Sequence, residues 1–173
     1  MNFQELKGKV ALVTGGAQGI GRTLVESLAT QGVKVAVVDY NEEQLNLQVN
    51  RLKEQGFDVF AFPANVGESK AIDAIVEQVE SEIGPIEMLV NVAGVLSSGP
   101  IHTFSDQDWA RTFSINTTGV FNVSRAISRY MIPRKKGAIV TVGSNAASVP
   151  RISMAAYAAS KAATVMFTKC LGL

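Results

Sequence analysis

Short apolar runs alternate with longer amphipathic segments along most of the chain. The runs are rich in Val, Ile and Leu and predict β-strands at residues 9–14, 33–38, 58–62, 86–90 and 138–142. The segments between them repeat apolar positions every three or four residues, which predicts helices over residues 19–31, 42–55, 68–83 and 106–132, with a last helix from about residue 155. The pattern therefore predicts a series of βα units.

Strands that are apolar on both pleat faces indicate a sheet covered on both sides, and parallel strands require helical crossovers of the kind expected here. We therefore predict an α/β fold with a doubly wound, Rossmann-like parallel sheet of five strands in a single domain over residues 1–173. The helical pattern is still running at Leu173. We expect the natural chain to continue, with further C-terminal strands.

Composition and charge narrow the classes of function. The 173 residues are 47% hydrophobic with a net charge of +1, which is enough apolar material for one core and lacks the basic excess of nucleic-acid-binding proteins. The apolar run at residues 10–13 is far too short for a signal peptide or a membrane span, so we expect a cytoplasmic protein without a membrane partner. One cysteine and one histidine predict neither an internal disulfide nor a metal site.

A glycine-rich turn at residues 14–21 separates the first predicted strand from the first predicted helix. Unpaired amides and the helix dipole favour an anion at such a helix N-terminus. We expect Gly15 to permit the sharp turn, Gly19 to let amides approach phosphates, and Gly21 to let the helix pack closely on the strand. The same turn could also connect the two elements without binding a ligand.

Asp39 ends the second predicted strand, where a carboxylate can accept hydrogen bonds from an adenosine ribose. Its charge would repel a 2′-phosphate, and neither Gln18 nor Tyr40 supplies a compensating cation. The sequence therefore favours NAD over NADP as the cofactor. The alternative is that Asp39 only begins a turn with Asn41.

Tyr157 and Lys161 are four residues apart in the last predicted helix, so both side chains lie on one face. A neighbouring ammonium stabilises a phenolate, and Tyr157 could then take the proton of a substrate alcohol as hydride leaves its carbon. Taken alone, Tyr and Lys at this spacing are more often an exposed i,i+4 pair on a helix surface.

Two further polar residues complete a candidate catalytic set. Ser144 follows the fifth predicted strand, at the carboxyl edge where open α/β sheets bind ligands, and its hydroxyl could hold the reacting oxygen. Asn116 lies inside a long helical pattern although Asn is a mediocre helix former. We therefore expect a local distortion of that helix at Asn116, which could hold a water for proton relay.

With these motifs in this order, and with Asn91, Val92, Ala93 and Gly94 after the fourth strand, the sequence resembles the short-chain dehydrogenase/reductase family over essentially its whole length. The resemblance implies a catalytic tetrad of Asn116, Ser144, Tyr157 and Lys161. It also implies contacts to an NAD cofactor from Gly15, Gln18, Gly19, Ile20, Gly21, Asp39, Asn65, Val66, Asn91, Ala93, Gly94, Tyr157 and Lys161.

Two positions depart from the family's usual pattern. Asn65 stands where an Asp that touches adenine is usual, and Val92 stands where a second Asn is frequent. The amide of Asn65 can still donate and accept hydrogen bonds. We therefore expect adenine binding to be altered and not lost.

Residues 142–157 resemble the corresponding segment of family members that oxidise a cyclohexadiene diol carboxylate to a catechol of siderophore biosynthesis. This implies that Ser144 and Tyr157 contact the substrate, and we hypothesise that Arg151 binds its carboxylate, the alternative being a solvent-facing arginine. Other readings are a reductase of another carbonyl, such as a 3-oxoacyl thioester, and an inactive NAD-binding fragment. The resemblance further implies a homotetramer.

Overall fold

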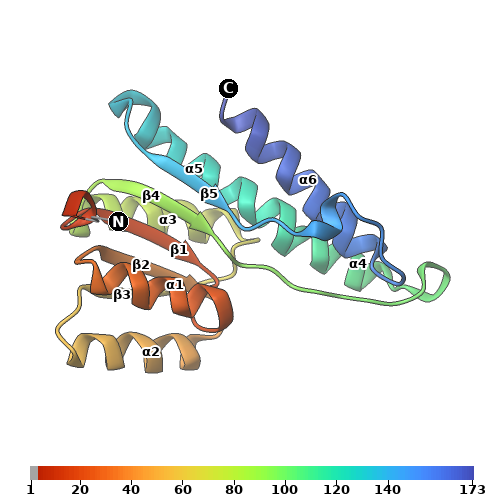
Figure 1. Ribbon diagram of the computed structural model, residues 1–173, viewed down its shortest axis with the longest axis horizontal. Coiled ribbons are helices and arrows are strands. Elements are labelled where there is room, and N and C mark those ends of the chain that lie inside the picture. Colours follow the sequence, from red (N-terminus) through yellow and green to blue (C-terminus); the bar gives the residue numbers. More distant parts are fainter. Residues whose placement is uncertain (1–3) are drawn as a thin grey trace.

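A single parallel sheet organises the protein in the computed structural model, which describes residues 4–173 (Figure 1). Its strand order is β3-β2-β1-β4-β5. The strands are β1 (Val10–Thr14), β2 (Lys34–Asp39), β3 (Val59–Pro63), β4 (Ile86–Asn91) and β5 (Ala138–Thr141). The order reverses direction between β1 and β4, so the predicted doubly wound α/β fold is confirmed.

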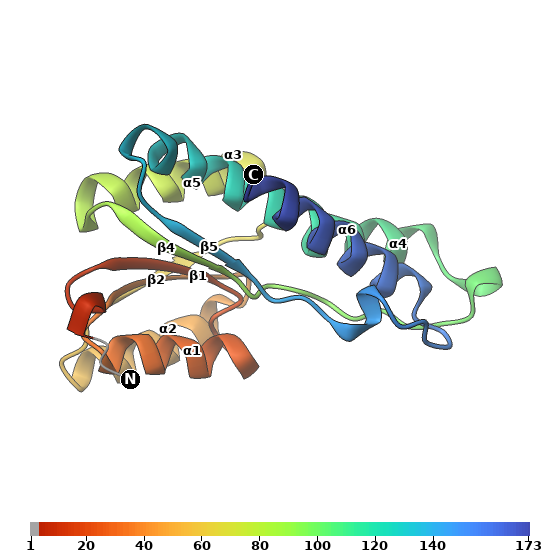
Figure 2. The ribbon, with the colours of Figure 1, turned by 45° about the horizontal axis from the view of Figure 1, so that its top comes forward.

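Helices cover both faces of this sheet (Figure 2). Helices α1 (Gly19–Thr30) and α2 (Glu42–Glu54) lie on one face, and α3 (Ser69–Gln78) and α5 (Val120–Arg134) lie on the other. Helices α4 (Asp106–Phe113) and α6 (Ala155–Leu171) lie on the same side as α5, toward the carboxyl ends of the strands. Within residues 4–173, every helix is too short or too polar to cross a bilayer.

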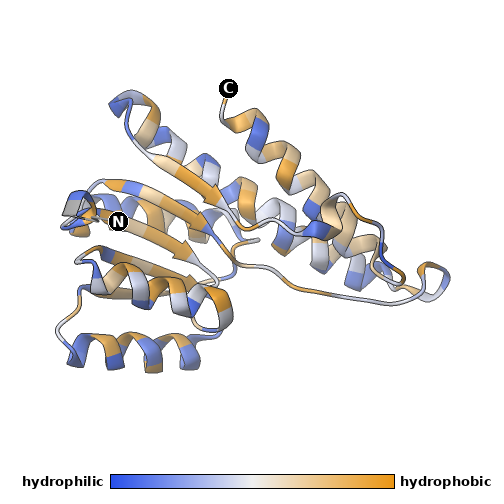
Figure 3. Ribbon diagram, viewed as in Figure 1, coloured by the Kyte–Doolittle hydropathy of each residue, from blue (hydrophilic) through white to orange (hydrophobic). Residues whose placement is uncertain are grey.

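Alternate residues of the strands supply two separate cores, one on each face. Val13 and Val37 pack with the residues of α1 and α2, whereas Leu12 and Val38, next to them in the chain, pack with those of α3 and α5. Apolar colour accordingly fills the strands in Figure 3, while polar colour marks the outer sides of the helices. Burial on both faces explains why the strand segments are unbroken apolar runs in the sequence.

Two of the predicted helices are interrupted. The segment 68–83 forms α3 followed by a π-helical turn, Val79–Ile83. The segment 106–132 is divided into α4 and α5 by the π-helical turn Ser114–Gly119, so the distortion expected at Asn116 is present. Helix α5 also runs two residues past its predicted end, through Pro133, and stops where Lys135 adopts a left-handed conformation.

The loops that follow β4 and β5 extend from the carboxyl edge of the sheet, where they meet α4 and the start of α6 (Figures 1 and 2). Ser105 fixes the start of α4, because its hydroxyl accepts a hydrogen bond from Asp108 N at 3.0 Å. Within residues 4–173, β5 pairs with β4 alone, and its Val140 is 55% exposed. The topology thus concentrates irregular chain, and with it the candidate site, at one edge.

Candidate active site

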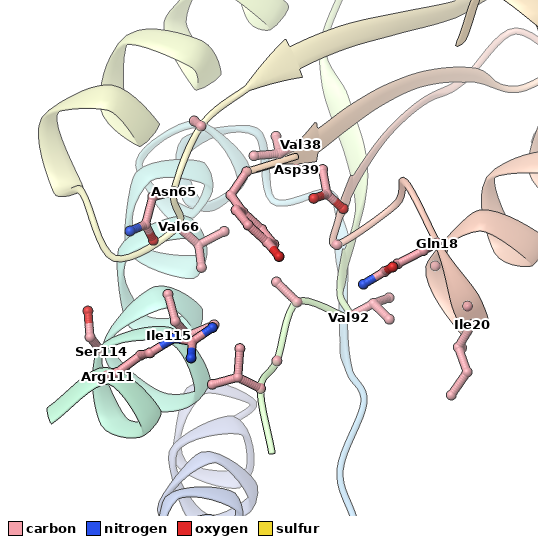
Figure 4. A pocket seen from close by; sticks show the side chains of 18 residues that line it. Gln18, Ile20, Val38, Asp39, Asn65, Val66, Val92, Arg111, Ser114 and Ile115 are labelled. Carbon is pink, nitrogen blue, oxygen red and sulfur yellow. The ribbon is translucent and has the colours of Figure 1, made fainter. Parts of the chain in front are cut away.

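A cavity of about 620 Å³ opens at the carboxyl edge of the sheet (Figure 4). It is formed by the turn before α1, the end of β2, the loops after β3 and β4, and the last turn of α4 with the π-helical turn. The predicted cofactor-side residues that line it are Gly15, Gln18, Gly19, Ile20, Gly21, Asp39, Asn65, Val66, Ala93 and Gly94. Segments distant in sequence therefore build one concave surface.

The turn before α1 has the form of an anion-binding loop. Gly15 has φ of +67°, and a Cβ there would lie 2.7 Å from the backbone of Ala93, while a Cβ on Gly21 would overlap the carbonyl oxygen of Gly15. Gly21 thus packs on the turn itself and not, as predicted, on the strand. Gln18 at the N-cap makes no side-chain capping bond, so the first-turn amides of α1 are available to a ligand. These features fit the pyrophosphate of a dinucleotide.

Asp39 is held rigidly in the cavity wall. Its side chain accepts hydrogen bonds from Ala17 N at 2.9 Å and from Asn41 N at 3.0 Å, and the residue is only 5% exposed. The first bond joins β2 to the glycine turn, and the second is the turn with Asn41 that the sequence offered as the alternative. The turn and a cavity-lining carboxylate therefore coexist.

The far end of the cavity is closed by the loop after β3. Asn65 Oδ1 accepts a hydrogen bond from Gly67 N at 2.9 Å, and Val66 packs against Gly119 of the π-helical turn. Figure 4 shows Arg111 beside Ser114 and Ile115, across the cavity from Asp39. Arg111 was not predicted from the sequence. Residues 111, 114 and 115 are spaced so that their side chains lie on one face of a helix, which could have indicated a shared site.

Asn91 does not line the cavity formed by the described residues. Its amide nitrogen donates to Ser124 Oγ at 3.2 Å and to Thr141 Oγ1 at 3.4 Å, inside the protein. Thr14, which the sequence placed only within the glycine motif, has a larger part: its hydroxyl accepts from the backbone N–H groups of Val92 and Ala93 at 3.1 and 3.2 Å. This pair of bonds fixes the loop after β4 on the glycine turn.

Lys161, on α6, extends its side chain to Gly94 of the cavity wall. Its Nζ donates to Val142 O at 2.9 Å, and a Cβ on Gly94 would lie 3.6 Å from Nζ. The residue is 6% exposed, and burial lowers the pKa of its ammonium. Tyr157 lies one helical turn earlier on α6, so the predicted Tyr and Lys share a helix face, and Lys161 is the one of the two whose side chain approaches Gly94.

Asn116 belongs to the same cluster. A Cβ on Gly94 would lie 3.3 Å from Asn116 Oδ1, and Asn116 Nδ2 donates to Ser160 Oγ at 3.0 Å. Ser160 Oγ in turn donates to Tyr157 O at 2.7 Å. Asn116 is therefore joined through Ser160 to the helix that carries Tyr157 and Lys161.

Ser144 and Arg151 lie on the loop after β5. Ser144 Oγ accepts from Ala146 N at 3.2 Å, at the start of the short 3₁₀ turn Asn145–Ala147 that contacts α6. Arg151 is exposed, and its predicted contact with a substrate carboxylate stays a prediction. The structure thus brings Asn116 and Lys161 together at Gly94, with Tyr157 one turn before Lys161 on α6, and holds the Ser144 turn against the same helix.

Known proteins of similar sequence indicate the family of this chain. A family model described as short chain dehydrogenase matches residues 9–173. The chain is 60% identical, over all 173 residues, to 2,3-dihydro-2,3-dihydroxybenzoate dehydrogenase of Bacillus subtilis (strain 168). The match covers 100% of this chain and 66% of that protein, so the chain spans slightly less than two thirds of its relative's length.

Solved structures of related dehydrogenases have the same fold. A short chain dehydrogenase/reductase from Burkholderia phymatum in complex with NAD superposes with a TM-score of 0.94 at 32% identity, covering 96% of this chain and 60% of that chain. A gluconate 5-dehydrogenase from Burkholderia cenocepacia J2315, in complex with NADP and tartrate, superposes with a TM-score of 0.91 at 36% identity and covers 98% and 66%. The fold is thus found with both nicotinamide dinucleotides.

Proposed function

The chain belongs to the short-chain dehydrogenase family, and on this basis we propose that it carries the cofactor-binding and catalytic residues of an NAD-dependent 2,3-dihydro-2,3-dihydroxybenzoate dehydrogenase of siderophore biosynthesis. The observation that carries the chemistry is the position of Lys161, buried beside Gly94 and one turn from Tyr157. The identity to the Bacillus subtilis enzyme supports the substrate.

The proposed reaction is the oxidation of a carbinol. Tyr157, as the phenolate, accepts the hydroxyl proton, while the Lys161 ammonium stabilises the phenolate charge and the Ser144 hydroxyl holds the reacting oxygen. Bound NAD supplies the acceptor for the hydride that leaves the same carbon. The resulting ketone then tautomerises: a proton leaves the ring carbon that bears the other hydroxyl and the ketone oxygen takes up a proton, which gives the aromatic catechol and makes the overall oxidation strongly favourable.

The choice of NAD rests on Asp39. Its carboxylate is fixed by two backbone N–H groups at the cavity wall, where it can accept hydrogen bonds from the ribose hydroxyls of adenosine. A 2′-phosphate there would meet this negative charge, and the cation of the cavity lining, Arg111, lies on the other side. We place the enzyme in the cytoplasm, as a homotetramer without nucleic-acid or membrane partners.

The test is NADH formation from 2,3-dihydro-2,3-dihydroxybenzoate by the purified protein and its Tyr157→Phe variant. We expect turnover by the protein and a loss of about 10²- to 10⁴-fold in kcat for Tyr157→Phe. Tyr130→Phe, on α5, is the matched control. Absence of turnover with this diol, while a 3-oxoacyl thioester is reduced, would contradict the substrate; an active Tyr157→Phe would contradict the mechanism.

A further inference from the structure

We propose that the cavity end formed by Asn65 and Arg111 is a hydrogen-bond-donor site for the purine, which accepts a purine with a carbonyl at C6 at least as readily as the 6-amino purine of NAD. This inference rests on the proposed function, because that function places a purine dinucleotide in the cavity.

The position of the purine follows from the order of groups along the cavity. Gly94 marks the reacting end, because Lys161 Nζ and Asn116 Oδ1 both lie close to it. Figure 4 shows Gln18 of the anion-binding turn on one side of the cavity, Asn65 on the other side and Asp39 between them. A dinucleotide with its nicotinamide at Gly94 and its ribose at Asp39 therefore has its purine beside Asn65.

Arg111 belongs to this same end. A Cβ on Gly67 would lie 2.5 Å from Ser114 Oγ, so the loop containing Asn65 and Gly67 directly contacts Ser114. Arg111 lies about one helical turn before Ser114 on the same face, and both residues line the cavity (Figure 4).

The hydrogen bonds of this end leave donors available. The N–H of Gly67 donates to Asn65 Oδ1, and since an N–H group requires an acceptor, this bond fixes the orientation of the amide. The amide oxygen accepts this one bond and keeps a second lone pair, and both N–H groups of the amide nitrogen remain to donate. Arg111 adds a guanidinium with N–H donors alone, and in residues 4–173 no ion pair engages it.

The substituent at C6 of a purine decides whether the protein must donate a hydrogen bond to it or accept one from it. An exocyclic amino group donates, and a carboxylate at position 65 would accept from it; an exocyclic carbonyl accepts, and it suits the amide nitrogen of Asn65 and the guanidinium of Arg111. Asn65 replaces the family's usual Asp and can donate to a 6-carbonyl, which a carboxylate cannot do. This end of the cavity therefore suits a purine with a carbonyl at C6.

The experiment is a fluorescence titration of the purified protein with NADH and with reduced nicotinamide hypoxanthine dinucleotide, which differs from NADH at C6 and at the adjoining ring nitrogen. We expect the hypoxanthine dinucleotide to bind as tightly as NADH, within about threefold. Asn65→Asp should shift the ratio of the two Kd values toward NADH by about tenfold, because a carboxylate repels the 6-carbonyl. This variant keeps an acceptor for Gly67 N, so the loop is retained.

Arg111→Met should weaken the hypoxanthine dinucleotide more than NADH, while Arg111→Lys, which retains a donor, should restore most of the loss. Arg129→Met, on the outer surface of α5, is the control and should leave both Kd values unchanged. A preference of the parent protein for NADH above tenfold, or an unchanged ratio in Asn65→Asp, would overturn the inference and leave the proposed function intact. Failure to bind either dinucleotide would contradict both.

Discussion

The side-chain amide of Asn116 is hydrogen-bonded to both backbone groups of Val95. Its oxygen accepts from Val95 N at 2.8 Å, and its nitrogen donates to Val95 O at 2.9 Å. Val95 lines the cavity, whereas Asn116 is fully buried in the π-helical turn between α4 and α5. The amide also bonds to Ser160 of α6. A single buried side chain thus sets the position of the cavity wall relative to the helix that carries Tyr157.

Asn116→Asp should therefore reduce both stability and turnover. The carboxylate can still accept from Val95 N, but the donor to Val95 O and Ser160 Oγ is lost and two oxygens come into contact. We expect the free energy of unfolding to fall by about 1–3 kcal/mol in denaturant titrations, with a matching loss of kcat. Asn41→Asp, which keeps a good N-cap for α2, is the control; equal stability of the two variants would argue against this role.

Gly21→Ala should disrupt the anion-binding turn. Its Cβ would overlap the carbonyl oxygen of Gly15, which is backbone and can yield only if the turn moves. We expect NADH affinity to fall by more than about tenfold, measured by fluorescence titration, because the first-turn amides of α1 would no longer be presented correctly. Gly172→Ala, where a Cβ makes only ordinary contacts, is the control. Normal NADH binding by Gly21→Ala would place the dinucleotide elsewhere.

Asp39→Ser should shift the cofactor preference toward NADP. The substitution removes the negative charge from this part of the cavity wall and frees Ala17 N to donate to a phosphate oxygen. We expect the ratio of NADPH to NADH affinity to rise by about tenfold or more, with NADH itself bound less tightly. An unchanged ratio would indicate that another group determines the nucleotide.

Lys161 should make the free energy of unfolding depend on pH in the alkaline range. Burial lowers the pKa of its ammonium in the folded state below the ordinary value of 10.5. Between the lowered pKa of the folded state and the ordinary value, Lys161 is protonated in the unfolded chain and deprotonated in the folded protein. Its contribution to the free energy of unfolding therefore rises with pH across this window.

The measurement compares denaturant titrations of the parent protein and Lys161→Met at increasing pH below 10.5. The difference in free energy of unfolding should move in favour of the parent protein as the pH rises, whereas Lys169→Met, exposed on the same helix, should follow the parent. A difference that stays constant with pH would show that the ammonium is not destabilised by burial.

The strand segments and the glycine turn could be predicted from the sequence because they depend on local patterns, whereas the strand order came from the structure. Residues 9–14 form an unbroken apolar run because β1 is buried on both faces, and Gly15 and Gly21 mark positions where a side chain does not fit. The break at Asn116 was also predictable, since Asn fits a helix poorly. The direction of the Asn91 side chain was not, because Ser124 and Thr141, which it contacts, belong to distant elements.

The sequence alone determined the α/β class, the spacing of Tyr157 and Lys161 on one helix, and the location of Asp39 at the end of a strand. Only the tertiary structure decided that Arg111 and Asn65 line the same cavity and that Lys161 lies beside Gly94. The physical reason is that periodicity and turn chemistry act between residues close in the chain, whereas the site is made by contacts between loops that come together only after the sheet has packed against its helices.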